Sequence, residues 1–151
     1  MSEYCVVIPA KNAAKFLAST LESVRQQTCP ASEIVVVDDG SNDATAEVAR
    51  AAGVTVMSHA TSSGPAASRN RGVAATTAPL VAFLDADDEW MPDHAERLLH
   101  ALAAEGAVFA GSGAQKFGAE TGVLTADLAD GASVDLRDAL IIDNPVIQSA
   151  A

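Results

Sequence analysis

The sequence predicts an α/β fold in which a mostly parallel sheet lies between two layers of helices. Short apolar runs rich in β-branched residues recur along the chain, and a helix signal follows each of them. Strands that alternate with helices are joined by right-handed crossovers and lie parallel, so that helices cover both faces of the sheet. The predicted architecture is therefore a three-layer α/β/α sandwich.

The predicted strands are continuous apolar runs of the kind found in strands that are buried on both faces of a sheet. They comprise residues 4–8, 34–37, 54–57 and 80–84, and a fifth apolar run follows at residues 107–110. The helix signals between them differ in kind. In order, they are apolar residues at helical spacing from Phe16 to Val24, a capping Asp43 before residues 44–52, Pro65 and Pro92 in first turns, and an apolar stripe over residues 95–102.

Length and composition indicate one globular domain over residues 1–151. Apolar residues make up 49% of the chain and charged residues 19%, which is enough apolar material for a core. Only residues 111–133, rich in Gly, Ala, Thr and Asp, indicate weak order or a hairpin with long loops. The formal charge of −11 repels nucleic acids and anionic membranes, but a bound divalent cation would still allow a small phosphorylated ligand.

The cysteines and the N-terminus favour a cytoplasmic location. Cys5 and Cys29 have neither metal-ligand spacing nor the pattern of a disulfide framework. The first residues lack the features of a signal peptide, and no window reaches the roughly 20 apolar residues of a membrane span. Membrane association through a longer parent protein stays open.

Polar residues follow three of the predicted strands, at the carboxyl ends where open α/β sheets bind their ligands. They are Lys11 and Asn12 after the first strand, Asp38, Asp39 and Ser41 after the second, and Asp85, Asp87 and Asp88 after the fourth. Five carboxylates at one edge repel one another, which raises their pKa values or loosens the loops unless a cation compensates. Since Mg²⁺ and Mn²⁺ are commonly shared between one or two carboxylates and substrate phosphates, we predict such an ion at Asp85 and Asp87.

Each motif also has a structural interpretation. Asp85 and Asp87 could form a turn before the helix that Pro92 announces, although their position directly after a buried strand favours the metal site. Asp38 and Asp39 fit a polar turn as well as an acceptor for a base N–H or a ribose hydroxyl. Asn12 fits a helix cap as well as a contact to phosphate or base.

Two arginines, Arg69 and Arg71, lie in the predicted helix after Gly64 and Pro65. A guanidinium group can pair with a diphosphate or with the carboxylates described above. Because the two lie two positions apart, one of them is expected to point inward and the other to form a surface contact.

In this order the motifs resemble the family 2 glycosyltransferases, which have the GT-A fold. The resemblance is dense over residues 4–105 and thins beyond them. It is carried by residues 6–12, 23–27, 34–43, 67–72 and 83–90, whose sequences include VVIPAKN, IVVVDDGSND, ASRNRG and FLDADDEW. Four such motifs in the same order are far more specific than any one of them.

The resemblance implies a nucleotide-diphospho-sugar donor, commonly linked to UDP, whose diphosphate is held by Mg²⁺ or Mn²⁺ at Asp85 and Asp87. Asp39 matches a uracil-contacting carboxylate, Pro9 a position that lines the base, and Arg69 an arginine beside the diphosphate. The metal then neutralises charge on the leaving nucleoside diphosphate. The substrate-binding residues that we predict are Pro9, Ala10, Asn12, Asp38, Asp39, Arg69, Asp85 and Ala86.

The resemblance stops short of the general base, which in this family lies in a later Glu-Asp-type motif. Residues 143–150 resemble a segment well before that motif, so we expect a donor-binding domain that is truncated on its acceptor side. The expected partners are a nucleotide-sugar and an unidentified carbohydrate or lipid acceptor, with no nucleic acid. Two alternatives stay open: a non-catalytic nucleotide- or sugar-binding module, which could share its site in a homodimer, and a nucleotidyltransferase.

Overall fold

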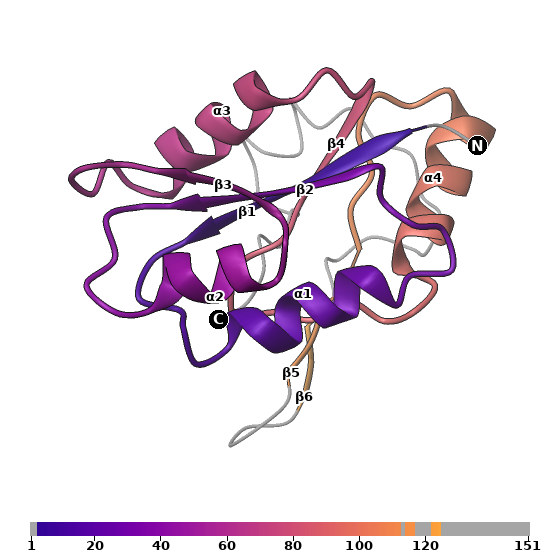
Figure 1. Cartoon of the computed structure of the whole chain (residues 1–151). Coiled ribbons are helices and arrows are strands. Elements are labelled where there is room, and N and C mark those ends of the chain that lie inside the picture. Colours follow the sequence, from indigo (N-terminus) through magenta and orange to yellow (C-terminus); the bar gives the residue numbers. More distant parts are fainter. Residues whose placement is uncertain (1–2, 113, 117–121, 125–151) are drawn as a thin grey trace. The chain divides into compact units, whose positions relative to one another are not determined.

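The computed structural model of the protein describes residues 3–112, 114–116 and 122–124 (Figure 1). Within this part of the chain, residues up to Ala95 form one compact unit, and the residues from Glu96 onward form a second. The first unit carries every predicted site residue.

The first unit contains the predicted parallel sheet, with strand order β3-β2-β1-β4. The strands are β1 (Tyr4–Ala10), β2 (Glu33–Asp38), β3 (Thr55–Ser58) and β4 (Leu80–Phe83), and each neighbouring pair is parallel. All seven residues of β1 are buried, because β1 is a central strand of a sheet with helices on both faces. The prediction that all four runs are buried on both faces is wrong for β3 and β4, because each is an edge strand of this sheet with only one described neighbour.

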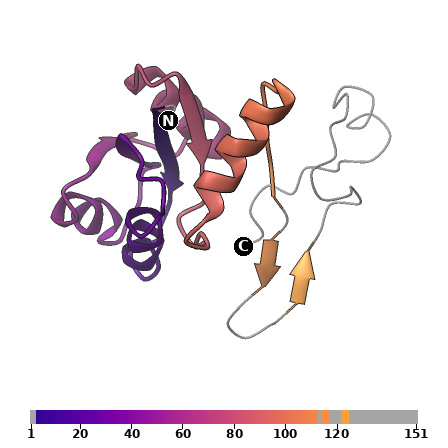
Figure 2. The ribbon, with the colours of Figure 1, turned by 90° about the vertical axis from the view of Figure 1, so that its right-hand side faces the viewer.

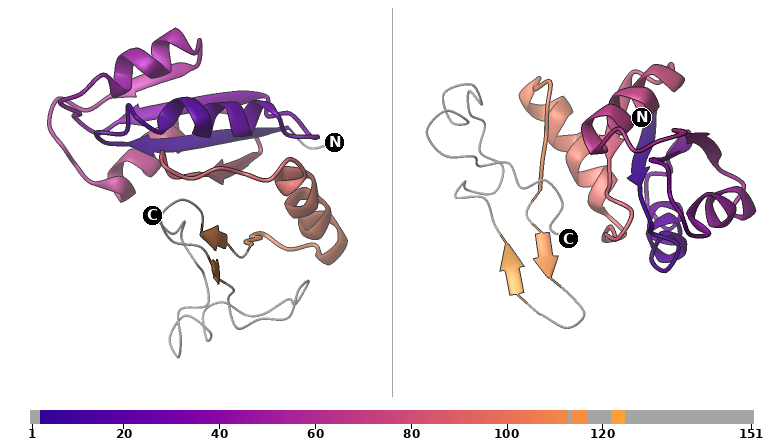
Figure 3. Two further views of the ribbon diagram at one scale, coloured as in Figure 1. Left: turned by 90° about the horizontal axis from the view of Figure 1, so that it is seen from below. Right: turned by 90° about the vertical axis from the view of Figure 1, so that its left-hand side faces the viewer.

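Helices cover both faces of this sheet, as predicted. They are α1 (Leu17–Arg25), α2 (Thr45–Ala51) and α3 (Pro65–Ala75). Figure 1 shows α3 above the strands and α1 and α2 below them, and the view from below in Figure 3 shows α1 and α2 in front of the strands. The N-cap residue of α2 is Ala44 and not the predicted Asp43, which lies one position earlier and accepts the N–H of Thr45, the first residue of α2.

The face under α3 is identified by a cluster of buried side chains from the two central strands. Alternate residues of β1 and β2 form it, and half-buried residues from both edges of the sheet pack against it. The helix comes close because Gly72 has no side chain: a Cβ there would lie 2.3 Å from Val7 Cγ1. The cluster comprises Cys5, Val7, Val35 and Val37, with Met57, Ala78 and Val81 packed against it.

The second unit contains most of α4 (His94–Glu105) and an antiparallel hairpin of β5 (Ala114–Lys116) and β6 (Gly122–Leu124), whose opposed arrows are visible in Figure 2. The hairpin interpretation of residues 111–133 is therefore confirmed for these two strands. The fifth apolar run does not form a strand. Gly106, at φ 60°, follows the last residue of α4, and the N–H of Ala107 donates to the carbonyl of Leu102. The first residue of the run is therefore part of the C-terminal cap of α4. No helix in the described part of the chain is both long and apolar enough to cross a membrane.

Candidate functional site

Two loops meet at the carboxyl ends of β1 and β2. Asn12 adopts a positive φ of 50°, its N–H donates to Ser41 Oγ at 2.9 Å, and its Oδ1 accepts the N–H of Asn42 at 2.9 Å. At the base of the loops, Pro9 and Ala10 are buried, and the carbonyl of Ala10 accepts the N–H of Asp39 at 2.8 Å. Asn12 therefore links the two loops by hydrogen bonds and does not cap a helix. Its role in substrate binding stays a prediction.

The neighbouring carboxylates Asp38, the last residue of β2, and Asp39, just beyond it, accept hydrogen bonds from different segments. Asp38 Oδ1 accepts the N–H of Ser41 at 3.1 Å. Asp39 faces the loop before α3, where Oδ2 accepts Ser62 Oγ at 2.7 Å and the N–H of Gly64 at 2.9 Å, and Oδ1 accepts the N–H of Ser63 at 2.7 Å.

These donors determine the electrostatics of Asp39, whose surface is only 4% exposed. The hydroxyl of Ser62, followed by the N–H of Ser63, lowers the pKa of Asp39 from 3.8 to about 2. The expectation that repulsion raises the pKa values is therefore wrong for Asp39, because three donors surround its carboxylate. Sequence reasoning missed these donors, since nothing in Ser62-Ser63-Gly64 indicates which distant carboxylate the loop meets.

Gly40 allows this close approach of the loops. It has a φ of 67°, and a Cβ at this position would lie 3.0 Å from the backbone nitrogen of Ser62. Any side chain at residue 40 would therefore be strained and would also push the loop away from Asp39.

On the other side of β1, Arg69 pairs with Asp85. Nη2 of Arg69 lies 2.7 Å from Asp85 Oδ1, and the two side chains are only 20% and 25% exposed. We expected one of the two arginines to point inward and the other to form a surface contact. Arg71 is instead half-buried as well, and its Nη1 lies 3.5 Å from His59 Nδ1. Of these two arginines, Arg69 is the one that forms an ion pair with a predicted metal ligand.

The loop after β4 presents its acidic residues in different ways. Asp87 is exposed, whereas Ala86 is buried and its carbonyl accepts Thr20 Oγ1 at 2.9 Å. Asp88 is half-buried, and its N–H donates to the carbonyl of Asp85 at 3.2 Å. No group of three or more His, Cys, Asp or Glu side chains in the described ranges could hold a metal ion. An ion bound at Asp85 and Asp87 would take its other ligands from water or substrate, which fits the coordination habits of Mg²⁺.

Polar residues on α1 and just beyond its end hold this acidic loop in place. Thr20 contacts Ala86, and Ser23 Oγ accepts the N–H of Trp90 at 3.1 Å. Gln27, which is 6% exposed, donates from Nε2 to the carbonyl of Met91 at 2.7 Å and accepts the N–H of Ala95 at Oε1 at 2.9 Å. We did not predict this function for α1. The available signal was a set of polar residues at positions 20, 23 and 27, at a spacing of three and four residues along the predicted helix.

The predicted residues therefore line a rim along one edge of the sheet. Asp39 lies at the end of β2, and the Arg69–Asp85 pair lies at the end of β4, with β1 between them. Two interstrand spacings separate β2 from β4, a distance of about 10 Å. The rim can take an elongated ligand that offers a hydrogen-bond donor at one end and anionic oxygens, with a cation, at the other.

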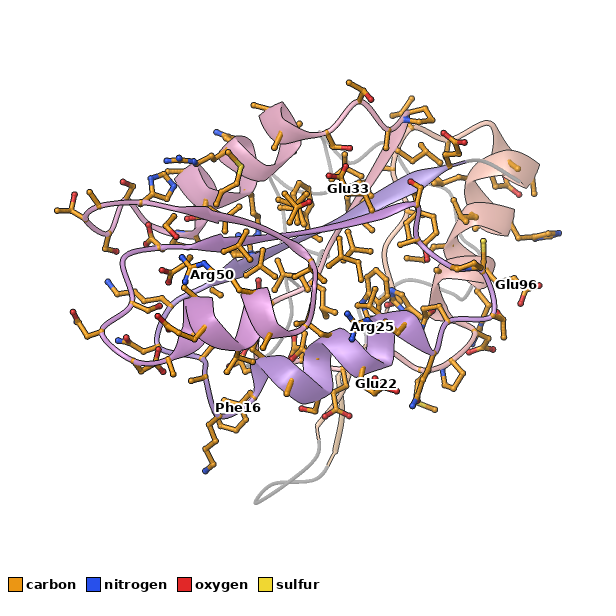
Figure 4. The ribbon with its side chains drawn as sticks, viewed as in Figure 1. Phe16, Glu22, Arg25, Glu33, Arg50 and Glu96 are labelled. Atoms are coloured by element: carbon orange, nitrogen blue, oxygen red, sulfur yellow. The ribbon has the colours of Figure 1, made fainter. Side chains whose placement is uncertain are left out.

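A cavity of about 360 Å³ lies at the opposite, amino-terminal edge of the sheet. Arg25, Ser32, Glu33 and Thr55 are among its lining residues, and Figure 4 labels Arg25 and Glu33. None of the predicted site residues lines this cavity, and open α/β sheets bind their ligands at the other edge.

The sequence pattern of glycosyl transferase family 2 matches residues 5–135 of the chain. The succinoglycan biosynthesis protein ExoU of Rhizobium meliloti (strain 1021) is 41% identical over 103 residues, which cover 65% of this chain and 30% of ExoU. The matched part of the chain thus spans 30% of the length of this curated relative.

Two solved structures show similar folds with ligands. The crystal structure of S. aureus TarS 1-349 in complex with UDP-GlcNAc has a TM-score of 0.64 and 26% identity, covering 69% of this chain and 32% of that chain. The mannosyltransferase PcManGT from Pyrobaculum calidifontis, in complex with GDP-Man and Mn²⁺, has a TM-score of 0.63 and 25% identity, covering 76% of this chain and 36% of that chain. The GT-A interpretation of the fold is confirmed by these similarities.

Proposed function

Because this chain belongs to glycosyl transferase family 2, we propose that its rim binds the nucleoside-diphosphate part of a sugar donor. The bound donor would supply a sugar for transfer to a carbohydrate or lipid acceptor. The observation that carries the proposal is the position of Asp39 and of the Arg69–Asp85 pair on either side of β1 at one edge of the sheet. The ligands of TarS and PcManGT, UDP-GlcNAc and GDP-Man with Mn²⁺, support the donor class.

In this proposal Asp39 receives the base. A carboxylate has about four lone-pair positions, and three are used here, two on Oδ2 and one on Oδ1. Oδ1 keeps the capacity to accept one further donor, such as a base N–H. The buried Pro9 and Ala10 would form the floor beneath the base, and Asp38 and Asn12 would hold the adjoining loops.

Asp85 and Asp87 would hold Mg²⁺ or Mn²⁺, with Ala86 anchoring the loop between them through Thr20. Their oxygen donors suit a hard divalent cation. When bound, the ion supplies positive charge that stabilises the leaving nucleoside diphosphate. Arg69 would add a second positive group on the same side of the rim, and no residue is assigned as the general base.

Calorimetric titration with UDP and GDP, each with and without Mn²⁺, tests the proposal. We expect metal-dependent binding of one of them, and its loss in the Asp85→Ala/Asp87→Ala variant. Asp93→Ala, which removes an exposed carboxylate outside the rim, is the matched control and should bind as the wild type does. Metal-independent binding, or equal binding by the double variant, would contradict the metal assignment.

A further inference from the structure

The ion pair between Arg69 and Asp85 occupies one of the two proposed metal ligands. Oδ1 of Asp85 lies 2.7 Å from the guanidinium, and both side chains are about three-quarters or more buried. Because the pair is largely buried, water screens its charges less effectively than it screens charges on the surface. A divalent ion arriving at Asp85 therefore meets a neighbouring positive charge that already neutralises the carboxylate.

A diphosphate changes this balance. Its oxygens accept the paired N–H donors of a guanidinium as well as a carboxylate does, and they also bind the metal ion. With a diphosphate present, Arg69 can pair with phosphate, and Asp85 becomes available to the metal. Arg71 cannot take this part, because its guanidinium lies beside His59 and not beside Asp85.

We propose that Arg69 is an internal counter-ion that makes the binding of metal and of diphosphate interdependent. In the free chain it holds Asp85 and weakens binding of the metal alone. When the nucleoside diphosphate binds, the guanidinium moves from the carboxylate to the phosphate. This inference rests on the proposed function, and it makes Arg69 a positioning residue that orders the assembly of the site.

The proposal makes two predictions of opposite sign for Arg69→Met, which keeps an unbranched apolar stem and removes the charge. Mn²⁺ alone should bind more tightly than to the wild type, because the competing charge is gone. The increase in Mn²⁺ affinity caused by UDP should become smaller, because nothing exchanges. Coupling between two sites typically amounts to about 5- to 150-fold, and we expect changes of about tenfold in each direction.

Electron paramagnetic resonance of free Mn²⁺ measures both quantities on the full chain, with no need for transfer activity. Titrations are run without nucleotide, with UDP and with uridine, after correction for the Mn²⁺–UDP complex that forms in solution. Uridine, which lacks phosphates, should leave the Mn²⁺ affinity of the wild type unchanged. Arg50→Met, on α2 and on the face of the sheet opposite α3, controls for the loss of one positive charge (Figure 4).

The outcomes separate this inference from the proposed function. If Arg69→Met binds Mn²⁺ alone no better than the wild type, the exchange is wrong, whereas loss of UDP binding in Asp85→Ala/Asp87→Ala still supports the donor site. If the double variant keeps metal-dependent UDP binding, the site itself is wrong. Should Arg69→Met fail to fold, Arg69→Lys provides the test: it keeps the charge but loses the planar fork, so Mn²⁺ alone should bind weakly and the UDP effect should shrink.

Discussion

The carboxylate of Asp39 is held by three donors from a single loop, so its charge and the position of that loop depend on each other. The pKa of Asp39 is lowered to about 2 in the folded chain from an ordinary value of 3.8. A lowered pKa contributes stability that is present above the unfolded value and is lost as the pH falls through the folded value. For Asp39 this loss occurs between about pH 4 and pH 2.

Asp39→Asn is expected to reduce the free energy of unfolding by about 1.5–3 kcal/mol at pH 6, the usual range for hydrogen bonds to a charged group. The difference from the wild type should shrink as the pH falls from 4 towards 2, because the wild-type carboxyl then becomes neutral too. Urea unfolding at a series of pH values measures this, with Asp93→Asn as the exposed control. A difference that stays constant down to pH 2 would contradict the role of the charge.

Among helices, α1 has two functions, because it packs on the sheet with Leu17, Leu21 and Val24 and holds the acidic loop with Thr20 and Ser23. Gln27, just beyond the end of α1, adds to the second function with bonds to Met91 and Ala95. Thus α1, although distant in sequence from Asp85, positions the residues that follow it.

We expect Gln27→Leu to lower the free energy of unfolding by about 1–3 kcal/mol, since it removes the acceptor of the N–H of Ala95, a buried residue. It should also weaken metal-dependent UDP binding although Gln27 does not belong to the proposed ligand contacts. Thermal unfolding and calorimetry measure the two effects. Gln26→Leu, which changes the exposed neighbouring glutamine whose side chain bonds to Glu22, should have little effect on either.

The contact between α3 and β1 depends on the absence of a side chain at Gly72. Gly72→Ala is expected to cost about 1–3 kcal/mol by overpacking against Val7, which is fully buried. In Val7→Ala/Gly72→Ala the added methyl group finds space, so the double variant should be more stable than the sum of the single changes predicts. Urea unfolding of all four chains gives the coupling, and strictly additive costs would show that the helix shifts to avoid the clash.

Across the whole molecule, local patterns in the sequence predicted which segments form strands and helices better than they predicted which strands lie side by side. The β-branched runs identified all four strands of the parallel sheet, and Asp43 marked the start of α2 because both signals are local. The edge positions of β3 and β4 depend on strand order, which no local pattern contains.

The candidate site was predictable to a similar depth. The rule that ligands bind at the carboxyl ends of strands identified Asp39 and Asp85, and the family resemblance selected Arg69. The long-range contacts of the Ser62–Gly64 loop determine which carboxylate meets which donor, and these appear only in the folded chain.

The strand order also determines when the rim can exist. From β1 the chain builds outward through β2 and β3, then crosses back so that β4 pairs with the free flank of β1, Tyr4 opposite Leu80. Closing so long a stretch of chain is slow compared with forming local contacts. During synthesis on the ribosome, one side of β1 therefore stays unpaired until β4 has emerged. The ion pair between Arg69 and Asp85 can form only after that point. We therefore expect the proposed rim to be among the last parts of this unit to assemble, and nucleotide binding would then report that β4 has joined the sheet.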